Sequence, residues 1–159
     1  MTSRSILRLI LCLALCLGVG AVTGSVTASQ IPTWYAGLVR PSWTPPNWTF
    51  PVVWTALYIL MGISLWLLWE RAIPGAARRW AIILFFVQLA LNAAWSPVFF
   101  SLHATRPALA IIVSMVIAIA LVIATAWRVQ RTAAWLMVPY LLWVSYATSL
   151  NAGIIVLNP

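Results

Sequence analysis

The sequence has almost no acidic residues and only one histidine. Its 159 residues include no lysine or aspartate, and Glu70 is the only carboxylate side chain. Paired carboxylates for general acid–base catalysis are therefore missing, and no acid is available to orient His103 in a hydrolytic triad. Ion-coupled transporters place ionisable groups within the membrane. The apolar runs of this chain contain essentially no such groups, and no phosphate-binding glycine loop occurs. The sequence thus argues against a hydrolase, a kinase and a proton-coupled pump.

Cysteine is also scarce, and its spacing does not indicate a metal site. Cys12 and Cys16 lie four residues apart inside an apolar run, which fits neither a zinc site nor a haem attachment motif. We expect two buried thiols that behave as small apolar side chains. His103 follows the third apolar run, where we expect it to be solvated or to cap a helix. Ligation of a metal or haem iron by His103 is the alternative.

Long hydrophobic runs, in contrast, dominate the chain. Hydrophobic residues make up 64% of the sequence and charged residues 6%. About 20 apolar residues are enough for a helix to span a bilayer. Five such runs occur, at residues 6–27, 50–69, 80–101, 107–128 and 132–157. The sequence therefore predicts an all-α membrane protein, a bundle of five transmembrane helices in the lipid bilayer that forms one domain over residues 1–159.

The arginines are distributed unequally between the two sides of this bundle. The net charge of +8 comes from nine arginines. Seven flank the helices on one side, namely Arg4, Arg8, Arg71, Arg78, Arg79, Arg128 and Arg131. Only Arg40 and Arg106 lie on the other side. The positive-inside rule then places the N-terminus in the cytoplasm and the C-terminus outside. Nucleic-acid binding is not expected, because no clustered basic face occurs.

The first apolar run has a second interpretation, as a cleaved signal peptide. Arg4 and Arg8 precede an apolar core, and Val26-Thr27-Ala28 forms a possible cleavage site. Gly20-Ala21-Val22-Thr23-Gly24, however, is a small-xxx-small motif that suits close helix packing in a membrane. This motif favours a retained helix.

The segment 40–54 contains three tryptophans and four prolines between two apolar runs. Proline fixes φ and removes backbone donors, so most of this segment is neither an ordinary helix nor a central strand. The aromatic rings of such a rigid loop stay exposed to solvent unless they pack over another part of the protein or over a ligand. We therefore predict a lid over a binding site.

Polar and aromatic residues recur at steps of four along the predicted helices, which places them on single helix faces. The stripes are Gly20, Gly24 and Ala28, with Ser25 beside them; Trp54, Tyr58 and Gly62; Gln88, Asn92 and Ser96, with Trp95 beside them; and Pro139, Trp143, Ala147 and Asn151. With the predicted topology they meet in the outer half of the membrane, under the loop. They indicate a pocket for a large, flat, mainly apolar ligand. The alternative is that the tryptophans form an interfacial belt and the polar groups only join helices.

Several motifs resemble the TspO/MBR family of tryptophan-rich sensory and translocator proteins, also called peripheral-type benzodiazepine receptors. They are Trp34-Tyr35, Arg40-Pro41-Ser42-Trp43-Thr44-Pro45-Pro46, Trp54-Thr55-Ala56-Leu57-Tyr58, Gln88-Leu89-Ala90-Leu91-Asn92, Trp95-Ser96-Pro97-Val98-Phe99-Phe100, Val138-Pro139-Tyr140-Leu141-Leu142-Trp143 and Ala147-Thr148. The resemblance covers nearly the whole chain, in order and at the expected spacing.

The resemblance implies a five-helix membrane protein, commonly a homodimer, that binds tetrapyrroles such as protoporphyrin IX and haem as ligands and needs no obligatory cofactor or metal. Related proteins also bind isoquinoline carboxamide and benzodiazepine-type drugs. By motif position the implied ligand contacts are Tyr35, Pro45, Phe50, Trp54, Tyr58, Asn92, Trp95, Trp143 and Ala147. Trp54 and Asn92 would donate hydrogen bonds to a ligand carbonyl or carboxylate.

The resemblance leaves three functions open: sensing or sequestration of porphyrin without catalysis, its transport, and its light-dependent degradation by Trp54 and Trp143. We favour the non-catalytic function. The sterol motif of animal relatives is absent, since no tyrosine, lysine or arginine follows Tyr146. We therefore expect a bacterial member. The positive-inside rule favours the inner membrane, and an outer membrane is the alternative.

Overall fold

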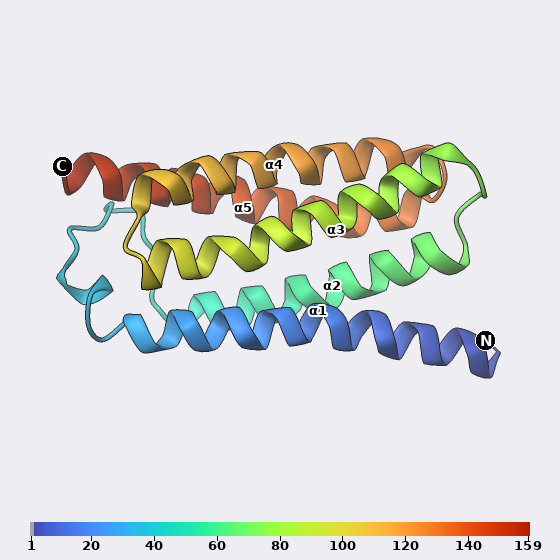
Figure 1. Cartoon of the computed structure of the whole chain (residues 1–159), viewed down its shortest axis with the longest axis horizontal. Coiled ribbons are helices and arrows are strands. Elements are labelled where there is room, and N and C mark those ends of the chain that lie inside the picture. The colour runs from blue at the N-terminus through green and yellow to red at the C-terminus, as the bar shows by residue number, and fades with distance from the viewer. Residues whose placement is uncertain (1) are drawn as a thin grey trace.

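Five long helices account for most of the chain. The computed structural model describes residues 2–159, in which the helices are α1 (Ser3–Gln30), α2 (Thr49–Glu70), α3 (Ala76–Ser96), α4 (Thr105–Trp127) and α5 (Arg131–Leu157) (Figure 1). All five are long and apolar enough to cross a membrane. Residues 2–159 contain no strand. The predicted all-α bundle of five transmembrane helices is confirmed, and the chain is an integral, multi-pass membrane protein.

The helix bounds differ from the hydrophobic runs where caps and proline decide them. The run 6–27 lies inside α1 (Ser3–Gln30), and the Thr2 hydroxyl caps that helix by accepting a hydrogen bond from the Ser5 amide at 3.3 Å. The third run was expected to continue as a helix to residue 101. Instead α3 ends at Ser96, and a π-helical turn, η2 (Pro97–Ser101), follows. Proline at its start lacks the N–H that a continuing α-helix needs.

The helices form a closed ring in the order α1, α2, α5, α4, α3. Extensive packing joins α1 to α2, α2 to α5, and α4 to both α3 and α5, whereas α1 meets α3 and η2 over a smaller area. The C-terminus, the long α1–α2 loop and the α3–α4 connection lie at one end, called here the loop end (Figure 1). The N-terminus and the other two connections lie at the opposite end.

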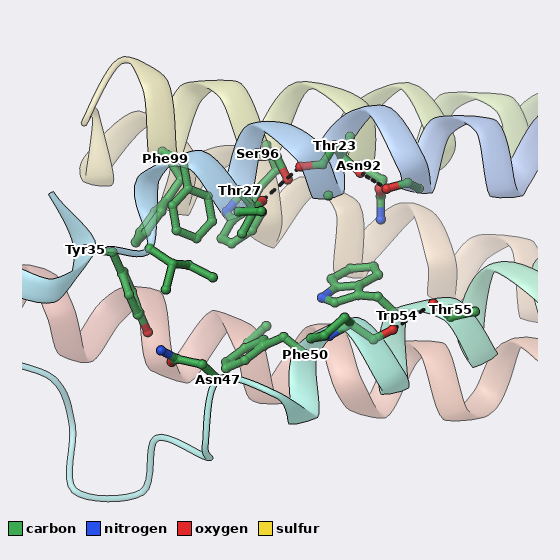
Figure 2. Close-up of a pocket in the computed structure, with 18 of the residues that line it drawn as sticks. Thr23, Thr27, Tyr35, Asn47, Phe50, Trp54, Thr55, Asn92, Ser96 and Phe99 are labelled. Carbon is green, nitrogen blue, oxygen red and sulfur yellow. Dashed lines mark hydrogen bonds between the residues drawn. The ribbon is translucent and has the colours of Figure 1, made fainter. Parts of the chain in front are cut away.

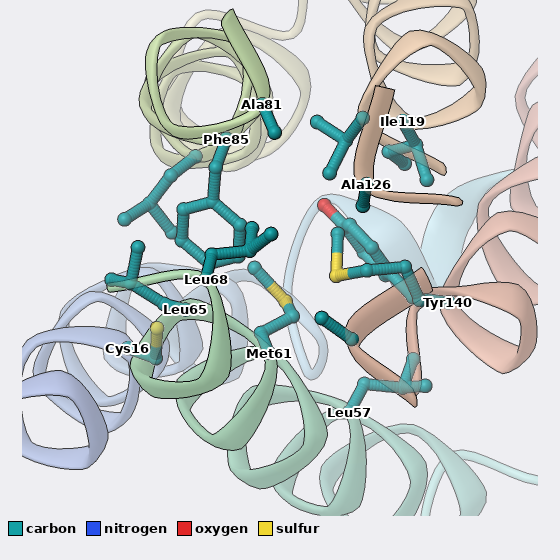
Figure 3. Packing of buried hydrophobic residues seen from close by; sticks show 14 of the residues in the cluster. Cys16, Leu57, Met61, Leu65, Leu68, Ala81, Phe85, Ile119, Ala126 and Tyr140 are labelled. Carbon is teal, nitrogen blue, oxygen red and sulfur yellow. The ribbon is translucent and has the colours of Figure 1, made fainter. Parts of the chain in front are cut away.

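The main core fills the half of the bundle away from the loop. Met61 and Leu68 of α2, Phe85 of α3 and Tyr140 of α5 are completely buried in it (Figure 3). Cys12 and Cys16 are also buried and form no disulfide, as expected. At Gly62 an added Cβ would lie 3.0 Å from the Leu13 Cα, so glycine permits α1 and α2 to approach closely.

The connection between α1 and α2, residues 31–48 and called here the loop, is attached to α5 and to Asn158 that follows it. Asn158 accepts a hydrogen bond from the Val39 amide at 3.0 Å and donates one to the Val39 carbonyl at 2.9 Å. Tyr146 donates to the Trp43 carbonyl at 2.6 Å. Pro41 packs against Gly153, where an added Cβ would lie 2.5 Å from the proline Cγ. The helical turn η1 (Tyr35–Gly37) lies within the loop. These contacts hold the loop over the end of the bundle.

Candidate functional site

A cavity of about 450 Å³ lies beneath the loop, between α1, α2, α3, η2 and α5 (Figure 2). This volume is within the range typical of small-molecule sites. Helix α4 contributes no lining residue, and no lining side chain of the cavity is charged. The lining consists of aromatic and aliphatic groups with a few hydroxyls and amides. Such a surface suits an apolar ligand with a small number of polar groups.

Seven of the nine sequence-predicted ligand contacts line this cavity: Tyr35, Phe50, Trp54, Tyr58, Asn92, Trp95 and Ala147. They come from the loop and from the three helices α2, α3 and α5, so the predicted convergence of the stripes beneath the loop agrees with the geometry. The two remaining residues, Pro45 and Trp143, lie outside the lining.

Trp143 is separated from the cavity by Phe50. The rings of Phe50 and Trp143 meet edge to face with centroids 5.9 Å apart, and Phe50 is the one that lines the cavity. The indole Nε1 of Trp143 is buried and has no hydrogen-bond partner within residues 2–159. Ala147 lies four positions after Trp143 on α5, and of the two only Ala147 lines the cavity. Helical spacing alone does not distinguish these two positions.

Pro45 lines a second, more polar cavity of about 580 Å³ within the loop itself. The other residues of this second cavity are Leu38, Arg40, Pro41, Thr44, Pro46 and Asn47. Asn47 lines both cavities, so they adjoin.

The inner end of the main cavity is closed by a buried hydrogen-bond network around Asn92. The Tyr58 hydroxyl donates to Asn92 Oδ1, and Asn92 Nδ2 donates to the Tyr140 hydroxyl at 2.9 Å. Tyr140 in turn donates to Met115 Sδ at 3.3 Å, and Thr23 lies 3.3 Å from the Tyr58 oxygen. An amide nitrogen has two hydrogens. Asn92 therefore keeps one N–H for a ligand while it joins three helices.

Trp54 packs against the same tyrosines and keeps its donor free. Its ring centroid lies 5.7 Å from that of Tyr58 and 6.1 Å from that of Tyr140. The indole N–H of Trp54 has no hydrogen-bond partner among the described residues and is not fully enclosed. It is thus available to a ligand acceptor.

Trp95, in contrast, has its donor engaged. Its Nε1 donates to Asn151 Oδ1 at 3.3 Å, and Asn151 Nδ2 donates to the Thr105 carbonyl at 3.0 Å. The ring stacks on Phe99 with centroids 5.1 Å apart. Trp95 therefore offers the cavity an aromatic surface and no hydrogen bond.

Phe99 and Phe100 line the cavity although they were not predicted as contacts. Both follow Pro97 in η2, and the π-helical turn changes their direction from that of a regular helix. Tyr35 packs against Phe100 with centroids 5.7 Å apart. Two adjacent phenylalanines after a proline were a visible signal, but the direction of their rings depends on the turn.

His103 is exposed at the loop end and stacks on Trp34 with centroids 4.3 Å apart. Its Nε2 lies 3.4 Å from Gln30 Oε1. Across residues 2–159 no group of three or more histidine, cysteine or acidic side chains is placed to hold a metal ion. The geometry gives His103 a role in packing α1 against the α3–α4 connection.

The small residues of α1 have two different roles. An added Cβ at Gly20 would lie 2.5 Å from Tyr58 Cδ2, so this glycine makes room for the tyrosine. At Gly24 nothing lies within 4 Å, and Gly24 lines the cavity instead. The expectation of close packing along the whole small-xxx-small motif is therefore wrong at Gly24. Thr23 and Thr27 also line the cavity, whereas Ser25 is exposed and donates to its own helix.

The cavity opens sideways between α1 and α2. Lining residues Ala21, Gly24 and Ala28 of α1 and Thr55 of α2 are exposed. The seam between these neighbouring helices lies on the outside of the ring, where a membrane protein meets lipid. The exposed side of the cavity therefore faces the bilayer.

The loop closes the other end of the cavity with Tyr35 and Asn47, whose polar ends point toward one another (Figure 2). Burial raises the pKa of the Tyr35 hydroxyl above its ordinary value, and the nearby Arg40 guanidinium opposes this effect. Tyr35 therefore stays protonated at neutral pH and can donate a hydrogen bond.

Comparison with known sequences gives a consistent result. The sequence profile described as the TspO/MBR family matches residues 12–157. The tryptophan-rich protein TspO of Archaeoglobus fulgidus is 39% identical over 154 residues, which cover 97% of this chain and 99% of that protein. The tryptophan-rich sensory protein of Cereibacter sphaeroides is 38% identical, with 79% and 77% covered. The translocator protein of Homo sapiens is 39% identical, with 74% and 70% covered.

Proposed function

Because the chain belongs to the TspO/MBR family, we propose that it is a membrane receptor or sensor that binds tetrapyrroles such as protoporphyrin IX or haem. The ligand occupies the cavity beneath the loop. Relatives named as a sensory protein and as a translocator protein support a receptor-type role. Binding serves to sense or sequester the porphyrin.

The observation that carries this proposal is the combination of an uncharged aromatic cavity with a free donor. Flat apolar rings gain from burial against aromatic side chains. Trp54 supplies both a ring and an unpaired N–H, and Asn92 supplies a second N–H close by. A large ring with few acceptors fits this lining better than a small polar metabolite does.

Binding without chemistry is favoured over light-dependent degradation by the position of Trp143. Degradation would use the indoles of both Trp54 and Trp143 against the ligand. Only Trp54 lines the cavity, and Phe50 lies between the cavity and Trp143. The Phe50 ring would have to move before a ligand touched the second indole.

The packing of the helices also disfavours the transport function, in which the porphyrin would pass through the bundle. The cavity is confined to the loop end, and the opposite half is filled by a close-packed core that includes Met61, Leu68 and Phe85. Transport across the bilayer would require that core to open.

Titration of the protein in lipid nanodiscs with protoporphyrin IX tests the proposal. Saturable quenching of tryptophan fluorescence is expected for the unaltered chain. Asn92→Ala should weaken binding by about tenfold, since it removes one ligand hydrogen bond of about 1–1.5 kcal/mol. Trp54→Ala should weaken binding further, because it removes an aromatic ring contact together with a hydrogen bond. Trp48→Ala is the matched control, because Trp48 is 68% exposed and lies outside the cavity.

Thermal unfolding of each variant should accompany the titration, because Asn92 also joins Tyr58 to Tyr140. Equal affinities for the two cavity variants and the Trp48 control would sink the proposed site. Illumination of the bound complex then separates binding from degradation: a new absorbance band that disappears in Trp143→Phe would establish the enzyme instead.

A further inference from the structure

The cavity has no means of its own to neutralise an anionic ligand. Its lining contains no charged side chain, yet protoporphyrin IX carries two carboxylates on one edge of its ring. Placing an ionised carboxylate in an apolar site is strongly unfavourable unless a cation or water accompanies it. A tetrapyrrole bound here must therefore direct its carboxylates toward a neighbouring polar region.

Arg40 lies at the polar region that adjoins the cavity. It lines the second cavity, which shares Asn47 with the first. Its guanidinium carbon lies 5.6 Å above the ring of Tyr35, and Tyr35 lines the main cavity. The guanidinium and the Asn47 amide thus stand at the junction between the apolar cavity and the polar one.

Arg40 has no acidic side chain with which to pair. Glu70 is the only acidic side chain of the sequence, and it pairs with Arg8 at 2.6 Å at the opposite end of the bundle. Within residues 2–159 Arg40 forms no ion pair. Its charge is therefore available to a ligand carboxylate.

The backbone on both sides of Arg40 is held in place. Val39 exchanges two hydrogen bonds with Asn158, and Pro41 packs against Gly153. Thr44 donates to the Pro41 carbonyl at 2.8 Å. A fixed backbone reduces the conformational entropy that the loop loses when a ligand binds.

We propose that Arg40 and Asn47 form an anion subsite that receives the carboxylates of a flat aromatic ligand whose ring occupies the main cavity. This inference rests on the proposed function and narrows the ligand class to planar aromatic carboxylic acids. Guanidinium pairs with carboxylate through two parallel hydrogen bonds. Arg40 is exposed, so water weakens the pair, and we expect the free acid to bind about five- to tenfold tighter than its neutral ester.

Protoporphyrin IX and its dimethyl ester differ only at these carboxylates, so the pair tests the subsite. Both are titrated into the full chain in zwitterionic nanodiscs, with partitioning into empty nanodiscs subtracted. The unaltered chain should prefer the acid. Arg40→Gln should lower the affinity for the acid to that for the ester and leave the ester unchanged, and Arg40→Lys should keep part of the preference.

Arg106→Gln is the matched control, since it removes the other arginine of the loop end and lines neither cavity. It should keep the preference for the acid. An unchanged ratio of acid to ester affinity in Arg40→Gln would overturn the subsite, as would an equal loss in Arg106→Gln, which would indicate net charge alone. Lack of saturable binding for both porphyrins would instead overturn the proposed function, on which the subsite depends.

Discussion

The single amide of Asn92 joins three helices and also lines the cavity. Its oxygen accepts from Tyr58 and its nitrogen donates to Tyr140, so the side chain is positioned before any ligand arrives. Hydrogen bonding between helices, one of the two interpretations of the Gln88, Asn92 and Ser96 stripe, is therefore observed at this residue. A role of Asn92 in ligand binding stays a prediction. Gln88, one turn earlier on α3, is different.

Gln88 is completely buried, and neither atom of its amide has a partner among the described residues. An unpaired buried amide is destabilising by about 1–3 kcal/mol. We therefore expect Gln88→Met, which keeps the volume and removes the polar atoms, to raise the free energy of unfolding by roughly that amount. Denaturation in detergent, followed by tryptophan fluorescence, measures the change.

Asn92→Ala serves as the comparison, since it removes an amide that is hydrogen-bonded, and it should lower the same free energy. A decrease for Gln88→Met would show that the Gln88 amide has a partner such as a buried water.

At the scale of the elements, the seam between α1 and α2 forms an exposed side of the cavity. Gly20 and Gly62 bring the two helices together through Tyr58 and Leu13, whereas Gly24 faces open space. The same pair of helices is thus tightly joined over one part of its length and open beside the cavity.

Gly24→Leu should fill this opening and weaken porphyrin binding by about tenfold, because a few apolar ligand contacts are worth on the order of 1–2 kcal/mol. Stability should be unchanged or slightly higher, since nothing lies within 4 Å of the new Cβ and leucine favours a helix over glycine. Affinity and thermal unfolding, measured on the same nanodisc sample, check both expectations.

Gly18→Leu is the control, because Gly18 is equally open but does not line the cavity. Similar losses of affinity in Gly18→Leu and Gly24→Leu would contradict access through the seam.

The elements also show which features of the site could be predicted from the sequence. The apolar runs were sufficient to predict the five helices. The four-residue spacing of polar and aromatic side chains was sufficient to predict that Trp54, Tyr58 and Asn92 line one cavity. The positions of Pro45 and Trp143 depend on the path of the loop and on the ring of Phe50. Those are tertiary properties that helical spacing does not contain.

The C-terminal end of α3 could not be predicted from the sequence for a similar reason. Proline at position 97 can kink or end a helix, but whether a kink, a stop or a π-helical turn results depends on the packing of the following residues. The turn η2 directs Phe99 and Phe100 inward. A hydrophobic pattern cannot distinguish this outcome from a continuous helix to residue 101.

For the whole molecule, the unequal distribution of arginine coincides with the two ends of the bundle. Only Arg40 and Arg106 lie at the loop end, and the other seven lie at the opposite end, where the N-terminus is (Figure 1). The positive-inside rule then predicts that the loop and the cavity face away from the cytoplasm. In that orientation a ligand reaches the seam from the outer leaflet.

Cysteine labelling in intact cells or spheroplasts tests this orientation. Cys12 and Cys16 are at most 2% exposed, so they should react little with a membrane-impermeant maleimide. Ser42→Cys places a thiol at an exposed loop position, and Ala76→Cys places one at the exposed start of α3 at the opposite end. We expect Ser42→Cys to be labelled directly and Ala76→Cys only after permeabilisation. The reverse order would place the loop in the cytoplasm, and the ligand would then have to enter from the inner leaflet.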